Sequence, residues 1–298
     1  MMRRLREHNY FFVEFSQQFS AGLNIVFLST FWAAVFFSTN PAHGTMDLAD
    51  GPMMTEIKPA PANIMILLDD SGSMTFEVLS ADNYEGRFPN PDQDDQNGYC
   101  YIFDDAGDDT FQDDIRYMGQ AGRKLWKSQS HEYNVMYYDP EVAYDPWPSY
   151  DNQDFLPADK EFPKLHPFKK NAGAIELDGE SFSVTLEMAA LLDATLQVKN
   201  AHYFRQAENG VIYLVVLDGD EKKTKYFAIT EVEGSGMTEK IRKVKSVSGP
   251  PGEIRIDEYD QARQNFANWF TYHRRREYVA KGALAEVIKN LEGVRVGI

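Results

Sequence analysis

The sequence predicts an α/β fold in which an open, parallel sheet is interrupted by a long insertion. Three observations lead to this fold class: an apolar run at 64–68 that ends in a polar turn, an amphipathic segment at 257–292, and a second short apolar run at 294–298. A run that is apolar at every position suits a strand covered on both faces, as in parallel sheets. A sheet that stops at its second strand cannot close a core, so we expect the domain to be incomplete in this chain.

Composition limits the classes of function before any motif is considered. The chain has 298 residues, with 30 Lys and Arg against 46 Asp and Glu, and a formal net charge of -16. Such a charge repels phosphate backbones, so we expect no nucleic-acid partner. The single cysteine, Cys100, excludes an intrachain disulfide and any multi-cysteine zinc or iron–sulfur site. We expect it to be buried as a small apolar side chain.

The N-terminal segment is typical of an export signal. Three arginines within the first six residues precede a mostly apolar run at 22–37, and small residues follow at 42 and 44. This order predicts a signal peptide at 1–44, either cleaved or retained as an anchor. The apolar run is shorter than the roughly 20 residues of a membrane span, so no stable span is expected after cleavage. Residues 45–61, rich in proline, are predicted to be a linker.

The polar turn after the first strand is the main candidate site. Residues 62–74 contain the predicted strand and the turn, in which Asp69, Ser71 and Ser73 stand two residues apart around Gly72. One carboxylate and two hydroxyls can converge on a hard divalent cation, and the small octahedral shell favours Mg²⁺ or Mn²⁺ over Ca²⁺. With so few carboxylates the metal stays electrophilic, so a partner's acidic group would complete its shell. The alternative is a plain Ser/Gly turn.

Residues 257–298 are predicted to form the first helix and the second strand of the α/β domain. The apolar residues that recur at helical spacing are Ala262, Phe266, Trp269, Phe270, Ala280, Ala283, Leu284, Val287, Ile288 and Leu291. The pattern predicts one amphipathic helix that ends near Gly293. We expect Trp269 to pack against the 64–68 strand beneath the polar turn, and Arg274, Arg275 and Arg276 to be exposed.

Three segments carry a resemblance to a known family. Residues 63–74, the stretch 264–274 together with Ala280 and Lys281, and the aromatic segment 134–147 resemble the N-terminal region of the PilY family, the type IV pilus tip-associated proteins. The resemblance implies a von Willebrand factor A-like domain with a Rossmann-like sheet. It also implies that an α+β or irregular insertion separates the first strand from the first helix.

In this family resemblance the metal-dependent adhesion motif falls on Asp69, Ser71 and Ser73. The implied function is a non-enzymatic adhesion and assembly protein of the type IV pilus, which supports pilus biogenesis, surface attachment and twitching motility. The implied partners are minor pilins of the tip complex and a host or surface ligand that offers a carboxylate. The implied location is the periplasm, the pilus tip or the cell surface.

The predicted insertion, 75–256, leaves three alternatives open. Nine Asp and no Lys or Arg lie at 92–114, which is typical of a solvated acidic loop or, less favourably, a calcium site. The apolar run at 211–217 leads into Asp218, which is either the turn of a hairpin with 224–229 or an additional metal ligand. The aromatic stretch at 133–150 is either local core or a recognition surface.

An enzymatic function is the alternative from a different class. A secreted metal-dependent hydrolase could use the same turn on an α/β sheet. The sequence contains no Gly-x-Ser-x-Gly elbow, no P-loop and no dinucleotide fingerprint, and its six histidines show no ligand-like pairing. These absences favour a binding protein over an enzyme.

Overall fold

The structure, a computed structural model, divides the chain into two units, Met1–Lys58 and Pro59–Ile298, and every described residue belongs to the second. The described residues are 61–80, 87–91, 98–103, 117–149, 155–169, 172–189, 192–249 and 259–297. The signal peptide predicted at 1–44 and, apart from Pro61, the linker predicted at 45–61 lie outside the described residues.

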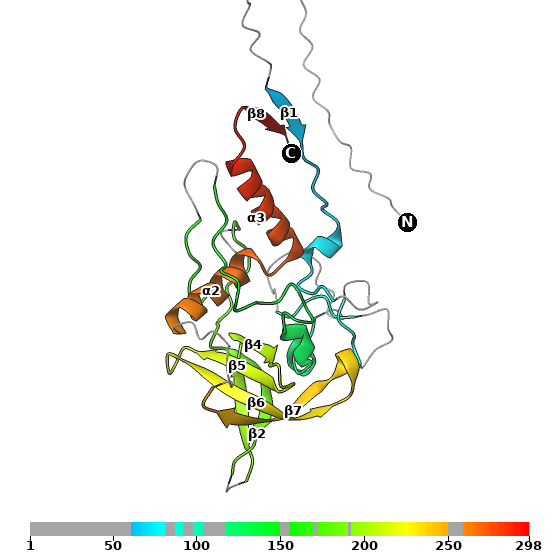
Figure 1. Cartoon of the computed structure of the whole chain (residues 1–298), viewed down its shortest axis with the longest axis vertical. Coiled ribbons are helices and arrows are strands. Elements are labelled where there is room, and N and C mark those ends of the chain that lie inside the picture. The colour runs from blue at the N-terminus through cyan, green and yellow to red at the C-terminus, as the bar shows by residue number, and fades with distance from the viewer. Residues whose placement is uncertain are drawn as a thin grey trace, which may run out of the picture. The chain divides into compact units, whose positions relative to one another are not determined.

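Six strands from the middle of the chain form a mixed, largely antiparallel sheet (Figure 1). In chain order they are Glu180–Leu186 (β2), Ala194–Lys199 (β3), His202–Gln206 (β4), Ile212–Asp218 (β5), Lys223–Glu233 (β6) and Lys240–Val247 (β7). The strand order is β3-β2-β7-β6-β5-β4, and only β2 and β7 run parallel to each other. The main sheet therefore comes from residues that the sequence assigned to an insertion.

Strand β5 is covered on both of its faces. Six of its seven residues are buried. Leu214 packs in one apolar cluster with Trp126, and its neighbour Val215 packs in another with Trp269. Adjacent side chains of a strand point to opposite faces, so the sheet has a separate core on each side.

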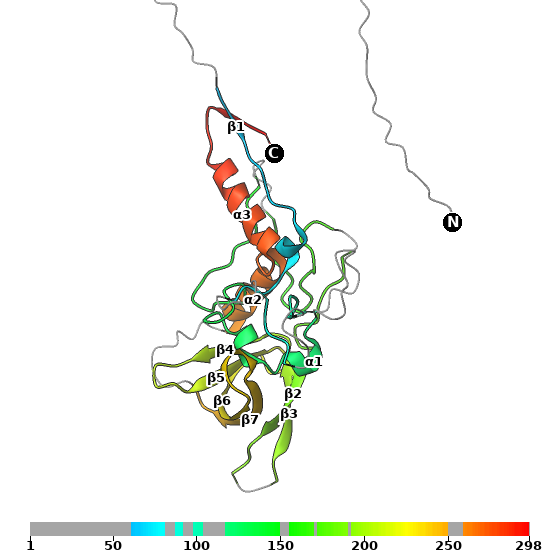
Figure 2. The ribbon, with the colours of Figure 1, turned by 90° about the vertical axis from the view of Figure 1, so that its right-hand side faces the viewer.

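Two helices follow the sheet along the chain, Tyr259–Tyr272 (α2) and Arg276–Lys289 (α3), and a single helical turn, Gly119–Gly122 (α1), precedes it. Figures 1 and 2 both place α2 between the sheet and α3. The rings of Tyr137 and Phe103 lie 4.9 Å and 6.2 Å from the indole of Trp269 on α2. This aromatic cluster joins α2 to the segments that precede the sheet.

A second, two-stranded sheet forms from the two ends of the described region. Strands Ala62–Met65 (β1) and Val294–Gly297 (β8) pair in parallel, with Ala62 opposite Val294. The pairing of the two apolar runs across a helix is the one part of the expected parallel sheet found in the described residues. The pair is little covered, because Met65 and Leu67 are 73% and 89% exposed.

The predicted fold class is wrong. The structure is mostly β, with a largely antiparallel six-stranded sheet, a small parallel pair and three helices in the described residues, and it is not a Rossmann-like von Willebrand factor A fold. The error has a physical reason: the apolar run at 64–68 was interpreted as a strand covered on both faces, whereas its side chains are largely exposed. The strand that is covered on both faces, β5, lies inside the predicted insertion.

The single long helix predicted at 257–292 is also wrong. It is broken between α2 and α3, and Arg274 and Arg275 at the break are fully buried instead of exposed. Trp269 is buried as expected, but its indole Nε1 donates a hydrogen bond to the carbonyl of Met136, 3.1 Å away, so it does not lie beneath the 64–68 strand. Arg274, at the break, has fixed partners in Glu77 and the carbonyl of Leu165.

Several expectations for the insertion are confirmed. Strands β5 and β6 form the hairpin, with Asp218 opposite Lys223. The aromatic stretch contributes Tyr137, Tyr138 and Trp147 to the core, and Cys100 is fully buried. Most of the acidic stretch at 92–114 lies outside the described residues. No helix in the described part of the chain combines the length and apolar character that a membrane span requires.

Candidate metal-binding turn

The structure brings Asp69, Ser71 and Ser73 together on one exposed turn. The 3-10 helix Gly72–Thr75 (η1) follows β1 after a short extended segment. A carboxylate oxygen of Asp69 accepts the backbone N–H of Ser71 at 2.9 Å, and the hydroxyl oxygens of Ser71 and Ser73 lie 3.1 Å apart. Hydrogen bonds from the Ser71 backbone and side chain lower the pKa of Asp69, which keeps the carboxylate ionised.

Thr75, the last residue of η1, holds the turn in place through its hydroxyl group. Its hydroxyl donates to the carbonyl of Gly72 at 2.8 Å and lies 2.8 Å from the hydroxyl of Tyr101. The backbone N–H of Met74 donates to the carbonyl of Ser71 at 2.9 Å. These bonds hold the backbone of the turn in place before any ligand binds, which reduces the entropy that a bound ion would have to remove.

The residues that follow η1 are buried, and Glu77 is among them. One carboxylate oxygen of Glu77 accepts the backbone N–H groups of Ile102 and Phe103 at 2.8 and 2.9 Å, and the other accepts Nε of Arg274 at 2.8 Å. The backbone N–H of Arg276, the first residue of α3, donates to the carbonyl of Phe76 at 3.3 Å. The turn is therefore anchored both to the segment at 98–103 and to the start of α3.

The donor set fits a small hard cation. In an octahedral shell with metal–oxygen bonds of about 2.1 Å, neighbouring ligand oxygens lie about 3 Å apart. The two serine hydroxyls form a hydrogen bond at 3.1 Å, a separation that two neighbouring ligands of such an ion could also have. Asp69, Ser71 and Ser73 would hold Mg²⁺ or Mn²⁺, and the bound ion would act as a Lewis acid toward an incoming carboxylate.

Asp218, the predicted additional ligand, is not part of this turn. It ends β5 in the six-stranded sheet, where its carboxylate pairs with Lys225 and accepts the backbone N–H of Glu221 at 3.1 Å. Burial opposes ionisation of Asp218, but these two contacts outweigh it and lower its pKa. Both carboxylate oxygens thus already have partners within the β5–β6 hairpin.

No group of three or more His, Cys, Asp or Glu side chains in the described part of the chain is placed to hold a metal ion. Comparison of the chain with protein-family models, with curated proteins and with solved structures finds no match.

Sequence reasoning missed the residues that support the turn. Glu77 stands between Phe76 and Val78, two apolar residues, and a carboxylate at such a position signals a buried charge with a partner. Its partner, Arg274, was interpreted as an exposed charge on the predicted helix. The contact of Tyr101 with Thr75 had no sequence signal, because it depends on how the 98–103 segment packs.

Proposed function

We propose that this protein binds Mg²⁺ or Mn²⁺ through Asp69, Ser71 and Ser73 and uses the ion to hold an acidic ligand. The observation that carries the proposal is the 3.1 Å separation of the two serine hydroxyls beside the Asp69 carboxylate. The turn is exposed, so a partner can approach it. With one carboxylate and two neutral hydroxyls, the site leaves half of the charge of the ion uncompensated, which favours a carboxylate from the partner as a further ligand.

The biological setting that we propose is the type IV pilus. It rests on the resemblance of segments 63–74, 134–147 and 264–274 to the PilY family. In this setting the protein is exported and non-enzymatic, and it acts in the periplasm, at the pilus tip or on the cell surface. Its partners are minor pilins and a carboxylate-bearing surface ligand, and its action supports pilus biogenesis, attachment and twitching motility.

Titration calorimetry of the full chain with Mg²⁺ and with Mn²⁺ tests the metal site. Wild type should give a saturable heat, and Ser71→Ala/Ser73→Ala should lose it. Ser246→Ala/Ser248→Ala is the matched control, because these two serines have the same spacing and are exposed elsewhere. Equal heats from wild type and the Ser71/Ser73 variant would refute the site.

The adhesion step needs a separate measurement. Wild type should be retained on a surface that displays glutamate carboxylates when Mg²⁺ is present, and EDTA should release it. The Ser71/Ser73 variant should pass through. Deletion of the encoding gene should reduce surface pili and twitching, and restoring wild type should recover both. Retention that ignores EDTA, or normal piliation after deletion, would contradict the proposed function.

A further inference from the structure

An apolar surface adjoins the candidate metal-binding turn. Met65 and Leu67 are 73% and 89% exposed. Ile64 and Ile66, which alternate with them along the chain, are half-buried. Adjacent side chains of an extended chain point to opposite sides, so Met65 and Leu67 share the open side. We call these two side chains the apolar track.

The apolar track leads directly to the metal-binding turn. Residues 66–71 form no turn or helix, and the backbone N–H of Ile66 donates to the carbonyl of Gly297 at 2.9 Å. Figures 1 and 2 show the chain running from β1 to η1 without folding back. Two residues of extended chain span about 7 Å at most, so the Cα atom of Leu67 lies within about 7 Å of that of Asp69. A ligand whose carboxylate reaches the turn can therefore contact Leu67 with a neighbouring side chain.

The side chain of Met65 lies close to the backbone of β8. Its register partner is Gly297, and a Cβ atom added to Gly297 would lie 3.5 Å from Sδ of Met65. The thioether is thus supported from one side while most of its surface remains in water. A supported side chain loses less freedom when a ligand covers it, which favours binding.

Charge limits which carboxylate-bearing ligands suit this site. Asp70 is exposed beside Asp69, and the chain carries a net charge of -16. Both repel further negative charge, so a ligand with many carboxylates is disfavoured. The other source of affinity is burial of apolar surface, which the apolar track offers.

We propose that the turn and the apolar track together bind a peptide segment that has one carboxylate and a large apolar side chain two residues away. This inference rests on the proposed metal-dependent function and specifies its ligand. In an extended peptide, side chains two residues apart share one side and lie about 7 Å apart, which matches the spacing of Leu67 and Asp69 along an extended chain. The carboxylate would complete the shell of the ion, and the apolar side chain would cover Leu67.

Fluorescence anisotropy of labelled peptides, titrated with the full chain in Mg²⁺, tests the proposal. The peptide Leu-Ser-Glu-Ser-Leu should bind about tenfold more tightly than Ser-Ser-Glu-Ser-Ser, because one leucine side chain becomes largely buried. Leu-Ser-Gln-Ser-Leu, which has no carboxylate, should not bind. Met65→Ser/Leu67→Ser should remove the preference for the leucine peptide and should still bind Mg²⁺ and Ser-Ser-Glu-Ser-Ser like wild type.

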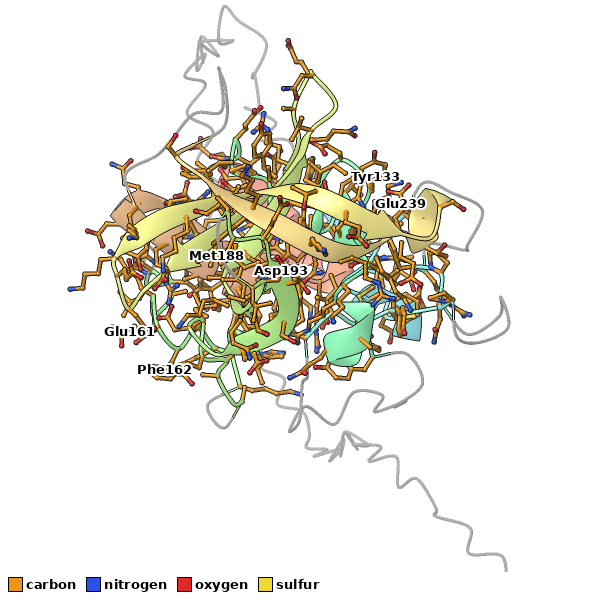
Figure 3. All side chains as sticks on the ribbon, turned by 90° about the horizontal axis from the view of Figure 1, so that it is seen from below. Tyr133, Glu161, Phe162, Met188, Asp193 and Glu239 are labelled. Carbon is orange, nitrogen blue, oxygen red and sulfur yellow. The ribbon has the colours of Figure 1, made fainter. Side chains whose placement is uncertain are left out.

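Met188→Ser/Leu192→Ser is the matched control, because it makes the same two changes at side chains that are 41% and 94% exposed. Figures 1 and 2 place β2 and β3 at the opposite end of the described region from β1, and Figure 3, seen from below, shows Met188 at that end. This variant should retain the preference for the leucine peptide.

Equal affinities of wild type for the two glutamate peptides would overturn this inference alone. Absence of Mg²⁺-dependent binding to both peptides would refute the proposed metal-dependent function, and this inference with it. Binding of the glutamine peptide as tightly as its glutamate counterpart would also overturn the inference, since the track would then act without the ion. Sedimentation velocity adds one more check: wild type that self-associates, beside a monomeric Met65/Leu67 variant, would show that a second copy covers the track and would overturn the proposal.

Discussion

Glu77 and Arg274, 197 positions apart in the sequence, form a buried ion pair that ties the candidate metal-binding turn to the junction of α2 and α3. Their side chains are 1% and 0% exposed. Arg274 also donates to the carbonyl of Leu165 at 2.8 Å, and its guanidinium lies 4.3 Å from the centre of the Phe270 ring. The pair therefore connects the turn, the segment that contains Leu165 and α2 at one point.

Replacing one partner of this pair should be strongly destabilising. Arg274→Met leaves the Glu77 carboxylate buried with no cation, which should lower the free energy of unfolding by about 3 to 5 kcal/mol. Urea denaturation followed by circular dichroism measures the change. Arg242→Met is the matched control, because the Arg242–Glu233 pair is half exposed on both sides and should contribute no more than about 1 kcal/mol. Similar losses in both variants would contradict the role assigned to the buried pair.

The Tyr101 hydroxyl should matter for metal binding more than for folding. Tyr101→Phe removes the 2.8 Å contact with Thr75 and loosens η1, so the affinity for Mg²⁺ should fall about tenfold while the melting temperature changes little. Calorimetric titration measures the affinity. Tyr133→Phe makes the same chemical change at a tyrosine that bonds Gln206 and should bind Mg²⁺ like wild type. An unchanged affinity for Mg²⁺ in Tyr101→Phe would mean that the turn does not depend on the contact between Thr75 and Tyr101.

His202 should make the fold sensitive to mild acid. Complete burial lowers its pKa from 6.5 to about 3, and its Nδ1–H donates to the carbonyl of Lys199 at 2.7 Å. At pH values below the ordinary pKa of histidine, the unfolded chain binds a proton at His202 that the folded chain does not. The contribution of neutral His202 to stability is therefore complete above that pKa and is lost as the pH falls below it. The free energy of unfolding should drop by about 2 kcal/mol between about pH 7 and about pH 5.

Denaturant melts at a series of pH values measure this slope in wild type and in His202→Asn. The variant should show a shallower slope, with a remainder from His273, whose pKa burial also lowers. A His202→Asn slope as steep as that of wild type would assign the acid sensitivity to other groups.

Gly219 should tolerate no side chain. A Cβ at this position would lie 2.1 Å from a carboxylate oxygen of Asp178, which pairs with the buried Arg263 at 2.7 Å. Gly219→Ala should displace that carboxylate and cost about 3 kcal/mol of stability. Gly210→Ala, at a turn glycine with a φ of 79° and no atom within 4 Å of the added Cβ, should cost about 1 kcal/mol. Thermal melts of the two variants measure these losses of stability. Equal losses would mean that the Asp178 carboxylate can move aside.

Local patterns predicted several elements of this protein correctly. The apolar run at 64–68 predicted a strand that overlaps β1 (Ala62–Met65) only at Ile64 and Met65, and the run at 294–298 predicted β8 and its parallel pairing with the first strand. The polar interruption after Asp218 predicted the β5–β6 hairpin, and the serine spacing predicted the exposed turn at 69–73. Apart from the pairing of β1 with β8, which joins segments far apart in the sequence, each of these features depends on neighbours within a few residues. Periodicity and turn chemistry report such local features directly.

The fold class depended on contacts between segments far apart in the sequence. Whether the 64–68 run is covered on both faces is decided by what packs on it, and the parallel pairing of β2 with β7 across four intervening strands has no local signal. The same holds for Arg274, which is polar enough for a helix surface and is buried only because Glu77 lies opposite it. By itself, the sequence determined local features: the β5–β6 hairpin, the serine turn and the amphipathic character of 257–292. Only the tertiary structure decided that β2, β3, β4 and β7 complete the sheet and which charges are buried. Burial and ion pairing are properties of two partners, and the pattern of either one alone does not contain the other.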